Sequence, residues 1–375
     1  MKVLTLLGTR PEIIRLSRVI DRLDAVCDHV LVHTGQNFHP ALSDVFFEEL
    51  GVRPPDRYLG IRGEGFAERV GQIVAASERL LRDERPDRLL VLGDTDSGIS
   101  AYVAKRLGIP VFHMEAGNRC YDDRVPEEVN RRVIDHSSDV LMPYTERSRA
   151  NLLREGIAPQ RIFVTGNPIK EVLDHHAAQI DASDVLSRLG VEAGGYLLLT
   201  MHRQETVDVE ERLRALVQGV IETAEDQRLS LICSMHPRTR AKLEVFNVPL
   251  ESERVQVMPA MGFFDFVKLE RHARCVLSDS GTVQEECCIF GVPAVTVRDT
   301  TERPETVECG SNVLSGVDPQ AIRACATAVL ERPNRWVAPP EYLVDDVSSV
   351  VAKIVLGHHE GPLVGSGDAA AARAI

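Results

Sequence analysis

The chain has 375 residues, of which 44% are hydrophobic and 26% charged, and its formal net charge is −13. This length suffices for two domains of ordinary size, and the composition excludes a fibrous or largely disordered protein. The acidic balance argues against a nucleic acid or an anionic membrane as a partner, because both require a broad basic surface.

The chain opens on a short apolar run, MKVLTLL, that ends in GTRPE. This pattern predicts a strand rather than a secretory signal, and no later run approaches the roughly 18 apolar residues of a membrane span. The eight cysteines show no CxxC spacing, so neither a zinc site nor a redox pair is indicated. We expect a reduced, cytoplasmic protein.

Short apolar runs then alternate with helix-like stretches along the whole chain. We expect strands at residues 3–7, 30–33, 89–92, 111–114, 140–142, 162–164, 196–200, 229–233, 255–257, 275–277 and 294–297. We expect helices at residues 67–82, 129–135, 210–225 and 283–290. Continuous apolar strands separated by helices predict parallel sheets covered on both faces, hence an α/β fold with two doubly wound domains.

Polar side chains follow nearly every predicted strand. In open parallel sheets, ligands bind beyond the carboxyl ends of the strands, so these positions are the informative ones. They are Arg10, Gln36, Asp94, Glu115, His202, His236, Asp279, Ser280 and Arg298. Two such edges facing each other would form a charged cleft between the domains.

Two strand ends lead into helices in a way that suits a phosphate. In GTRPEIIR, Thr9 and Glu12 fit a capping box, and Arg10 lies at a helix N-terminus, where backbone amides also bind anions. In SDSGTVQEE, the turn at residues 280–282 can direct amides toward a phosphate, and the two glutamates that follow can bind a ribose diol. Each motif also has a simpler explanation as an ordinary helix start.

Carboxylates cluster after two strands of the first half. Asp94 lies in GDTDS and Glu115 in HMEAGNR, while PEEVNRR places Glu127 and Arg131 four residues apart on one helix face. The alternatives are a helix cap or a weakly indicated metal site at GDTDS, and an exposed ion pair on the helix.

Histidines and a charged loop follow strands of the second half. TMHRQE contains His202, SMHPRTR contains His236, and RDTTERPE carries Arg298 and Arg303. Structural histidines and a solvated loop are the alternatives. Taken together, however, arginines and helix N-termini bind an anion, and carboxylates and a histidine move protons, so a phosphorylated substrate undergoing acid–base chemistry is indicated.

These segments together resemble the non-hydrolysing UDP-N-acetylglucosamine 2-epimerase family. The resemblance is carried, in chain order, by GTRPEIIR, HTGQNF, LGDTDS, HMEAGNR, VPEEVNRR, TMHRQETVD, SMHPRTR, SDSGTVQEE, RDTTERPE and the ending YLVDDVSSVVAKI. It implies two Rossmann-like domains facing across a cleft (the GT-B type) at residues 1–167 and 168–341. A helix at 342–360 would cross back to the first domain, and we expect a disordered tail at 361–375.

The resemblance implies an isomerase that interconverts UDP-N-acetylglucosamine and UDP-N-acetylmannosamine without a cofactor or a metal. A base would remove the proton at C2 of the sugar while UDP leaves from C1, giving a 2-acetamidoglucal. UDP would then add back, with a proton returning to the other face of C2. Cationic groups must stabilise the leaving UDP.

The matching motifs carry the family's residue roles onto this chain. The expected catalytic residues are Asp94, Glu115, Glu127, Arg131 and His202. The residues expected to bind the UDP-sugar are Arg10, Arg15, Arg119, His236, Ser280, Gly281, Thr282, Glu286 and Arg303. Within that set, Arg10, Ser280 and Gly281 would hold the pyrophosphate and Glu286 the ribose.

Three departures from the family pattern bear on specificity. Arg15 stands where lysine is common, which keeps the charge but changes its geometry. QNF at residues 36–38 replaces part of a loop that binds a second substrate molecule in some members, which puts allosteric activation in doubt. The segment AGNRCYDDRVP resembles the branch that acts on modified sugars, whereas DTTERPE resembles the UDP-N-acetylglucosamine branch.

Three alternatives to this function stay open in the sequence. They are the same epimerisation of a modified UDP-2-acetamido sugar (6-deoxy or diacetamido-uronate), a GT-B glycosyltransferase, and a non-catalytic nucleotide-sugar sensor. The carboxylates at strand ends argue against the last two. A homodimer is expected from the resemblance, while the sequence does not specify the substituents at C3, C4 and C6 or the pathway.

Overall fold

The computed structural model describes residues 1–35, 40–63, 65–331 and 335–357. The predicted tail at 361–375 and the QNF segment at 36–38 lie outside these residues. The chain forms two compact units. The first comprises residues 1–172 and the chain from Val344 onward, and the second comprises Leu173–Leu343.

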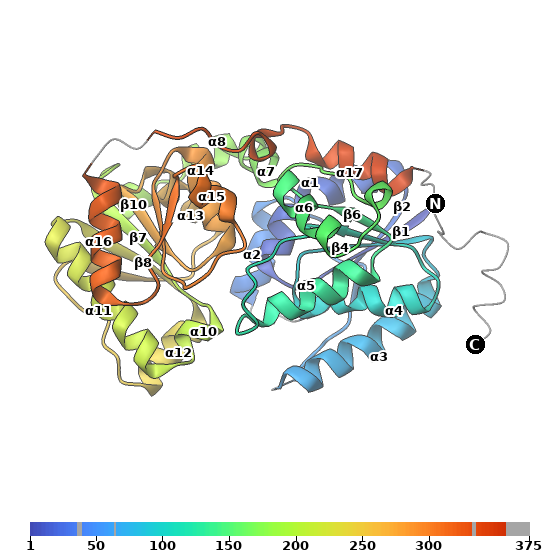
Figure 1. Ribbon diagram of the computed structural model, residues 1–375, viewed down its shortest axis with the longest axis horizontal. Helices are drawn as coiled ribbons and strands as arrows, with labels where there is room; N and C mark the ends of the chain where they lie inside the picture. Colours follow the sequence, from blue (N-terminus) through green and yellow to red (C-terminus); the bar gives the residue numbers. More distant parts are fainter. Residues whose placement is uncertain (36–39, 64, 332–334, 358–375) are drawn as a thin grey trace. The chain divides into compact units, whose positions relative to one another are not determined.

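Each unit is built on a six-stranded parallel sheet (Figure 1). The first, in the order β3-β2-β1-β4-β5-β6, contains β1 (Lys2–Leu7), β2 (Asp28–His33), β3 (Arg57–Tyr58), β4 (Arg88–Leu92), β5 (Val111–Met114) and β6 (Val140–Met142). The second, in the order β12-β11-β10-β7-β8-β9, contains β7 (Tyr196–Thr200), β8 (Ser230–Met235), β9 (Val255–Pro259), β10 (Cys275–Ser278), β11 (Ala294–Thr296) and β12 (Asn312–Leu314). Both orders reverse at one point, between β1 and β4 and between β7 and β10, which confirms the predicted pair of doubly wound, Rossmann-like sheets.

Helices connect the strands in both units. The first unit has α1 (Arg10–Val26), α2 (Pro40–Glu49), α3 (Phe66–Glu84), η1 (Asp96–Ile99), α4 (Ser100–Arg106), α5 (Pro126–Ser137), α6 (Glu146–Arg154), η2 (Pro159–Arg161) and α17 (Val347–Leu356), and α7 (Ile169–His175) spans the boundary. The second unit has α8 (Ala177–Ala182), α9 (Val185–Leu189), α10 (Gln204–Val207), α11 (Glu210–Gln227), α12 (Pro237–Val245), α13 (Phe263–His272), α14 (Gly281–Phe290), α15 (Pro304–Glu308), α16 (Pro319–Leu330) and η3 (Pro340–Leu343).

The first sheet is covered on both faces. On one face, α3, α4 and α5 bury Leu80, Ala101 and Ile134 against the strands. On the other face, α1 packs beside α17, the last described helix of the chain (Figure 1). The backbone amide of Ser348 in α17 donates to Glu171 (2.8 Å), and Val351 is fully buried. Helix α17 is therefore part of the first unit.

The second sheet has the same layered arrangement. Leu213 and Leu216 of α11 pack with Ile322 of α16 against one face. Leu269 of α13 and Val283 of α14 pack against the other. Because both faces are buried, the strands read as continuous apolar runs rather than alternating ones.

Two sequence expectations about strands were wrong. The run at residues 162–164 forms no strand but an isolated bridge between Ile162 and Leu141, beside backbone hydrogen bonds from Phe163 to Leu141 and from Thr165 to Pro143. The edge strands β3 and β12 were not predicted, since they are two and three residues long and include polar residues. Among the described residues, no helix combines the length and apolar character that crossing a membrane would require.

Candidate active site

The reversal point of the first sheet is marked by two loops, one after β1 and one after β4. Glu12 joins them: its carboxylate accepts hydrogen bonds from the Gly8 amide (3.0 Å), the Thr9 hydroxyl (2.7 Å) and the Thr95 hydroxyl (3.1 Å). The predicted capping box is thus only half formed, because the Thr9 hydroxyl donates to Glu12 and caps no backbone amide. Burial raises the pKa of Glu12 to about 7, against these hydrogen bonds, which lower it.

The two arginines expected in this region take different positions. Arg10 begins α1, and its guanidinium lies 5.5 Å from the ring centroid of Phe46. Arg15 is buried, forms an ion pair with Glu115 and lies 5.7 Å from the ring centroid of Tyr144. Arg15 therefore directs its charge to a predicted acid–base carboxylate, whereas Arg10 lies at a helix N-terminus, as a phosphate ligand would.

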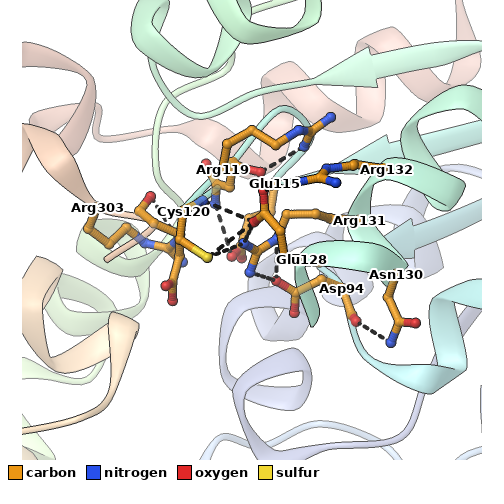
Figure 2. Close-up of polar contacts among 12 residues, drawn as sticks. Asp94, Glu115, Arg119, Cys120, Glu128, Asn130, Arg131, Arg132 and Arg303 are labelled. Carbon is orange, nitrogen blue, oxygen red and sulfur yellow. Dashed lines mark hydrogen bonds and ion pairs between the residues drawn. The ribbon is translucent and has the colours of Figure 1, made fainter. Parts of the chain in front are cut away.

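A carboxylate cluster follows β4 and β5 (Figure 2). Arg131 of α5 donates to the Asp94 carboxylate through both Nε (3.1 Å) and Nη2 (2.5 Å), and its guanidinium is buried. Burial raises the pKa of Asp94, and the negative charges of Glu115 and Glu127 raise it further against the lowering effect of Arg131. The structure thus brings Asp94, Glu115, Glu127 and Arg131 into one electrostatically coupled group.

Glu115 is held by an unusual backbone. Its φ of +64° lies in the left-handed region, which is uncommon for a residue other than glycine. Asn118 donates to its carboxylate (3.2 Å). Two residues on, Gly117 has φ of +80°, and a Cβ there would lie 2.3 Å from the Ser148 carbonyl oxygen, so only glycine fits. Strain of this kind is typical of functional sites.

Arg119, expected to contact the substrate, is instead directed into the first unit. Its guanidinium binds Glu155 in bidentate fashion (2.8 and 2.6 Å) and lies 2.8 Å from Asp135. Asp135 also binds His113, whose other ring nitrogen donates to the Gly93 carbonyl oxygen (2.8 Å). This network, which is buried except at Glu155, anchors the loop that carries Glu115 to the turn before Asp94, which is a positioning role.

Glu128 was not predicted as a site residue, and it forms an ion pair with Arg131. Its buried carboxylate accepts hydrogen bonds from the amides of Cys120 (2.9 Å) and Tyr121 (3.1 Å) and binds Arg131 and Arg132 (Figure 2). The sequence held a signal for it, since Glu128 precedes Arg131 by three residues on a helix. Neighbouring Glu127 is half-buried, so of the two glutamates it is the one with an accessible side chain.

In the second unit, His202 follows β7 and Asp279 follows β10, at the reversal point of the sheet. His202 Nδ1 lies 3.0 Å from Asp279 Oδ1, and the amides of His202 (2.6 Å) and Arg203 (2.8 Å) donate to Oδ2. Burial alone would raise the pKa of Asp279, but His202 and the two amides lower it to about 2. An ionised Asp279 thus fixes the orientation of a partly exposed imidazole. The ring of His236 lies 5.7 Å away from that of His202, centroid to centroid.

The expected phosphate turn forms the start of α14. Ser280 is its N-cap, and Gly281 begins the helix. A Cβ on Gly281 would lie 2.7 Å from Glu302 Oε1, so glycine is required here by the protein itself. His236 occupies the equivalent position of α12, where its Nδ1 accepts from the Arg238 amide (3.2 Å).

Buried ion pairs surround this turn. Arg303, predicted to bind substrate, is buried and forms an ion pair with Glu285. Arg298 donates to Glu302 (3.0 Å), as does Arg203 (3.3 Å). Removing a single partner from such a set would leave an uncompensated buried charge, which is strongly destabilising.

Comparison with known proteins places this geometry in context. The family model described as UDP-N-acetylglucosamine 2-epimerase matches residues 21–356. The chain belongs to this family. A UDP-N-acetylglucosamine 2-epimerase from Methanocaldococcus jannaschii is 39% identical over 347 residues, covering 90% of this chain and 95% of the relative. The crystal structure of the enzyme from that organism in complex with UDP-GlcNAc and UDP has a TM-score of 0.90 at 38% identity, covering 94% of this chain and 99% of that chain.

A second named relative differs in its substrate. The UDP-2,3-diacetamido-2,3-dideoxy-D-glucuronate 2-epimerase of Pseudomonas aeruginosa is 36% identical over 322 residues, covering 84% of this chain and 88% of the relative. Membership of the 2-epimerase family therefore includes proteins named for two different sugars. Within the described residues of this family member, no group of three or more histidine, cysteine, aspartate or glutamate side chains is placed to hold a metal ion.

Proposed function

We propose that this chain is a non-hydrolysing UDP-N-acetylglucosamine 2-epimerase, an isomerase that interconverts UDP-N-acetylglucosamine and UDP-N-acetylmannosamine. The observation that carries the proposal is the Asp94 carboxylate, which Arg131 binds through two guanidinium nitrogens and whose pKa is raised by the charges of Glu115 and Glu127. The family membership supports the same activity.

The reaction needs groups that remove a proton from one face of C2 and deliver one to the other. Asp94, with its raised pKa, keeps a proton to a higher pH than an ordinary aspartate and is suited to act as an acid. Glu115 faces the cation of Arg15, which stabilises a carboxylate and suits a base. We assign these two residues and Glu127 to the proton transfers, without assigning a face of C2 to each.

The departure of UDP from C1 needs positive charge and hydrogen-bond donors. In the second unit, we assign the pyrophosphate to the turn at residues 280–282 and the ribose to Glu286. His202 Nδ1 faces the Asp279 carboxylate, so we assign its Nε2 to the phosphate that leaves C1. In the first unit, we assign Arg10 to a phosphate.

Proton NMR of UDP-N-acetylglucosamine with the purified protein in deuterated water tests the proposal. We expect deuterium at C2 and new signals of UDP-N-acetylmannosamine. Glu115→Gln should reduce C2 exchange by at least about 10³-fold while UDP binding persists. As a control, Asp96→Asn changes a carboxylate at the same sheet edge that binds Arg69 and Asn130, and exchange should continue. A wild-type protein that binds UDP but leaves C2 protonated would contradict the proposal.

The second candidate is the same epimerisation of a modified sugar. The 36% identity to the diacetamido-uronate 2-epimerase favours it, as does the segment AGNRCYDDRVP. A panel of 6-deoxy and uronate UDP-sugars in the same NMR assay separates the two candidates, because the preferred substrate will show the larger kcat/KM for C2 exchange.

A further inference from the structure

Two buried glutamates lie side by side in the second unit. Glu270 is on α13 and Glu286 on α14, and their side chains are 0% and 3% exposed. The two helices pack against each other, and the charge of Glu286 acts on the Glu270 carboxyl group. Glu270 takes no part in the roles assigned above, whereas Glu286 is the residue assigned to the ribose.

The hydrogen bonds of Glu270 are incomplete for a carboxylate. Cys287 donates its thiol to Oε1 (3.4 Å), but Oε2 finds no donor among the described residues. A buried oxygen without a donor is costly, and two buried carboxylates in contact cannot both be ionised. Both problems disappear if Oε2 carries a proton, because it then donates to Glu286.

The surroundings of Glu270 favour that proton. The groups that act on it are Glu286 and Cys287 of α14, with Cys275 of β10 beyond the thiol, and none of these is a cation. The cations of α13 itself, Lys268 and Arg271, bind Asp181 at the surface. Burial, followed by the charge of Glu286, raises the pKa of Glu270 well above its ordinary value.

We propose that Glu270 and Glu286 share one proton, and that the Glu270 carboxyl group holds the Glu286 carboxylate in the orientation that receives the ribose of the UDP-sugar. This inference rests on the proposed function, which assigns the ribose to Glu286. Glu270 is a positioning residue, since it acts through its neighbour. Holding the Glu286 carboxylate in one orientation before the ligand arrives lowers the cost of ordering it on binding.

Three variants separate positioning from packing. Glu270→Gln keeps an N–H donor toward Glu286 but cannot be ionised. Glu270→Leu keeps most of the volume and removes the donor. Val267→Ala is the matched control, because Val267 is a buried residue of the same helix, one turn before Glu270, and carries no polar group. Calorimetry at pH 7 with UDP and with 2′-deoxy-UDP then reports how strongly the ribose hydroxyl is recognised.

We expect wild-type protein to prefer UDP over 2′-deoxy-UDP, and Glu270→Gln and Val267→Ala to keep that preference within about twofold. Glu270→Leu should reduce the preference at least about tenfold, as the loss of one hydrogen bond to a charged group would. Infrared difference spectra of wild type against Glu270→Gln at pH 7 should show the carbonyl band of a protonated carboxyl group that only the wild type has.

Two results would overturn the proposal. One is an unchanged preference for UDP in Glu270→Leu, and the other is the absence of the protonated carboxyl band from the wild-type spectrum. A failure of the proposed function is recognised separately. If wild-type protein binds no UDP, the ribose assignment falls, while the infrared comparison still decides whether the two glutamates share a proton.

Discussion

Asp94 and Asp279 both lie in a loop after a buried strand, yet the pKa values of their carboxyl groups are shifted in opposite directions. Burial and two nearby carboxylates raise the pKa of Asp94. His202 and two backbone amides lower the pKa of Asp279 to about 2, although burial opposes them. Such a separation is the usual mark of divided acid–base work: one group keeps a proton, and the other keeps a charge.

Asp279→Asn tests the positioning of His202. An asparagine oxygen can still accept from both backbone amides, but the substitution removes the charge that faces the imidazole, so kcat should fall about 10²-fold with the Kd for UDP nearly unchanged. The folded-state pKa lies below the unfolded value of 3.8, so the carboxylate contributes stability above that pH that is lost as pH falls through about 2. The variant should therefore lose about 2 kcal/mol of unfolding free energy at pH 7.

Asp208→Asn is the matched control for that experiment. Asp208 is a half-exposed carboxylate of the same unit whose pKa is also lowered against burial, by Arg238 and Lys242. Its loss should leave kcat within about twofold, since it acts on no imidazole. If Asp279→Asn also leaves kcat unchanged, Asp279 does not position His202 for catalysis.

At the scale of elements, the buried central strands were the predictable part of the fold. Strands β5, β6 and β7 have the predicted bounds, because each is a fully buried and mostly apolar run. The edge strands β3 and β12 were missed, because an edge strand buries less and needs no apolar run. The run at residues 162–164 was wrongly predicted as a strand for the converse reason: it is apolar but forms only a single bridge.

The sequence predicted the site residues at the ends of strands, but it did not predict which residues would form ion pairs with them. The strand-end rule located Asp94, Glu115 and His202, since each lies within two residues of the end of a predicted strand. It could not show that Arg119 serves Asp135 and Glu155, because those partners lie 16 and 36 residues further along the chain. Ion pairs between distant segments are set by tertiary packing, which no local sequence pattern records.

Glu12→Gln tests whether the buried Glu12 side chain, which accepts hydrogen bonds from the loops after β1 and β4, makes stability depend on pH. The folded-state pKa of Glu12, about 7, is raised above the model-compound value of 4.5. Its contribution to stability is therefore fully present below pH 4.5 and is lost as pH rises through about 7. From pH 5 to pH 9, wild type should lose about 3 kcal/mol more unfolding free energy than Glu12→Gln, as measured by urea denaturation.

The change of unfolding free energy with pH decides this prediction, and the absolute stability of each variant does not. Glutamine accepts fewer of the hydrogen bonds from Gly8, Thr9 and Thr95, so the variant loses some stability at every pH. Glu78→Gln changes an exposed carboxylate that binds Arg82 on α3, and its slope should equal that of wild type. Parallel slopes for wild type and Glu12→Gln would show that Glu12 ionises normally.

At the scale of the whole molecule, one strand order is used twice, and the chemistry is divided between the two copies. In our proposal the first unit supplies the acid–base carboxylates and the second supplies the turn for the pyrophosphate. The first unit is discontinuous in sequence, because α17 returns to pack on α1 after the second unit is complete. A homodimer stays a prediction from the family resemblance.

Because α17 belongs to the first unit, a substitution in α17 should destabilise that unit more than the second. Two spectroscopic probes can follow the unfolding of the two units separately. Trp336 is the single tryptophan and lies in the second unit, where its indole N–H donates to the Cys288 carbonyl oxygen (2.9 Å). Far-UV circular dichroism reports both units. Val351→Asp places a charge in the buried face of α17 and should destabilise the first unit by about 4 kcal/mol. The dichroism transition should then begin at lower temperature, while the Trp336 emission transition moves much less.

Leu216→Ala, in the buried contact of α11 with the second sheet, is the counterpart of Val351→Asp and should move the Trp336 transition instead. This pattern follows if each unit has its own core, since a core substitution then acts on the cooperative unit that contains it. If both variants shift both probes equally, the two units unfold as one cooperative body. The return of α17 would then couple the stability of the two units as well as completing the first.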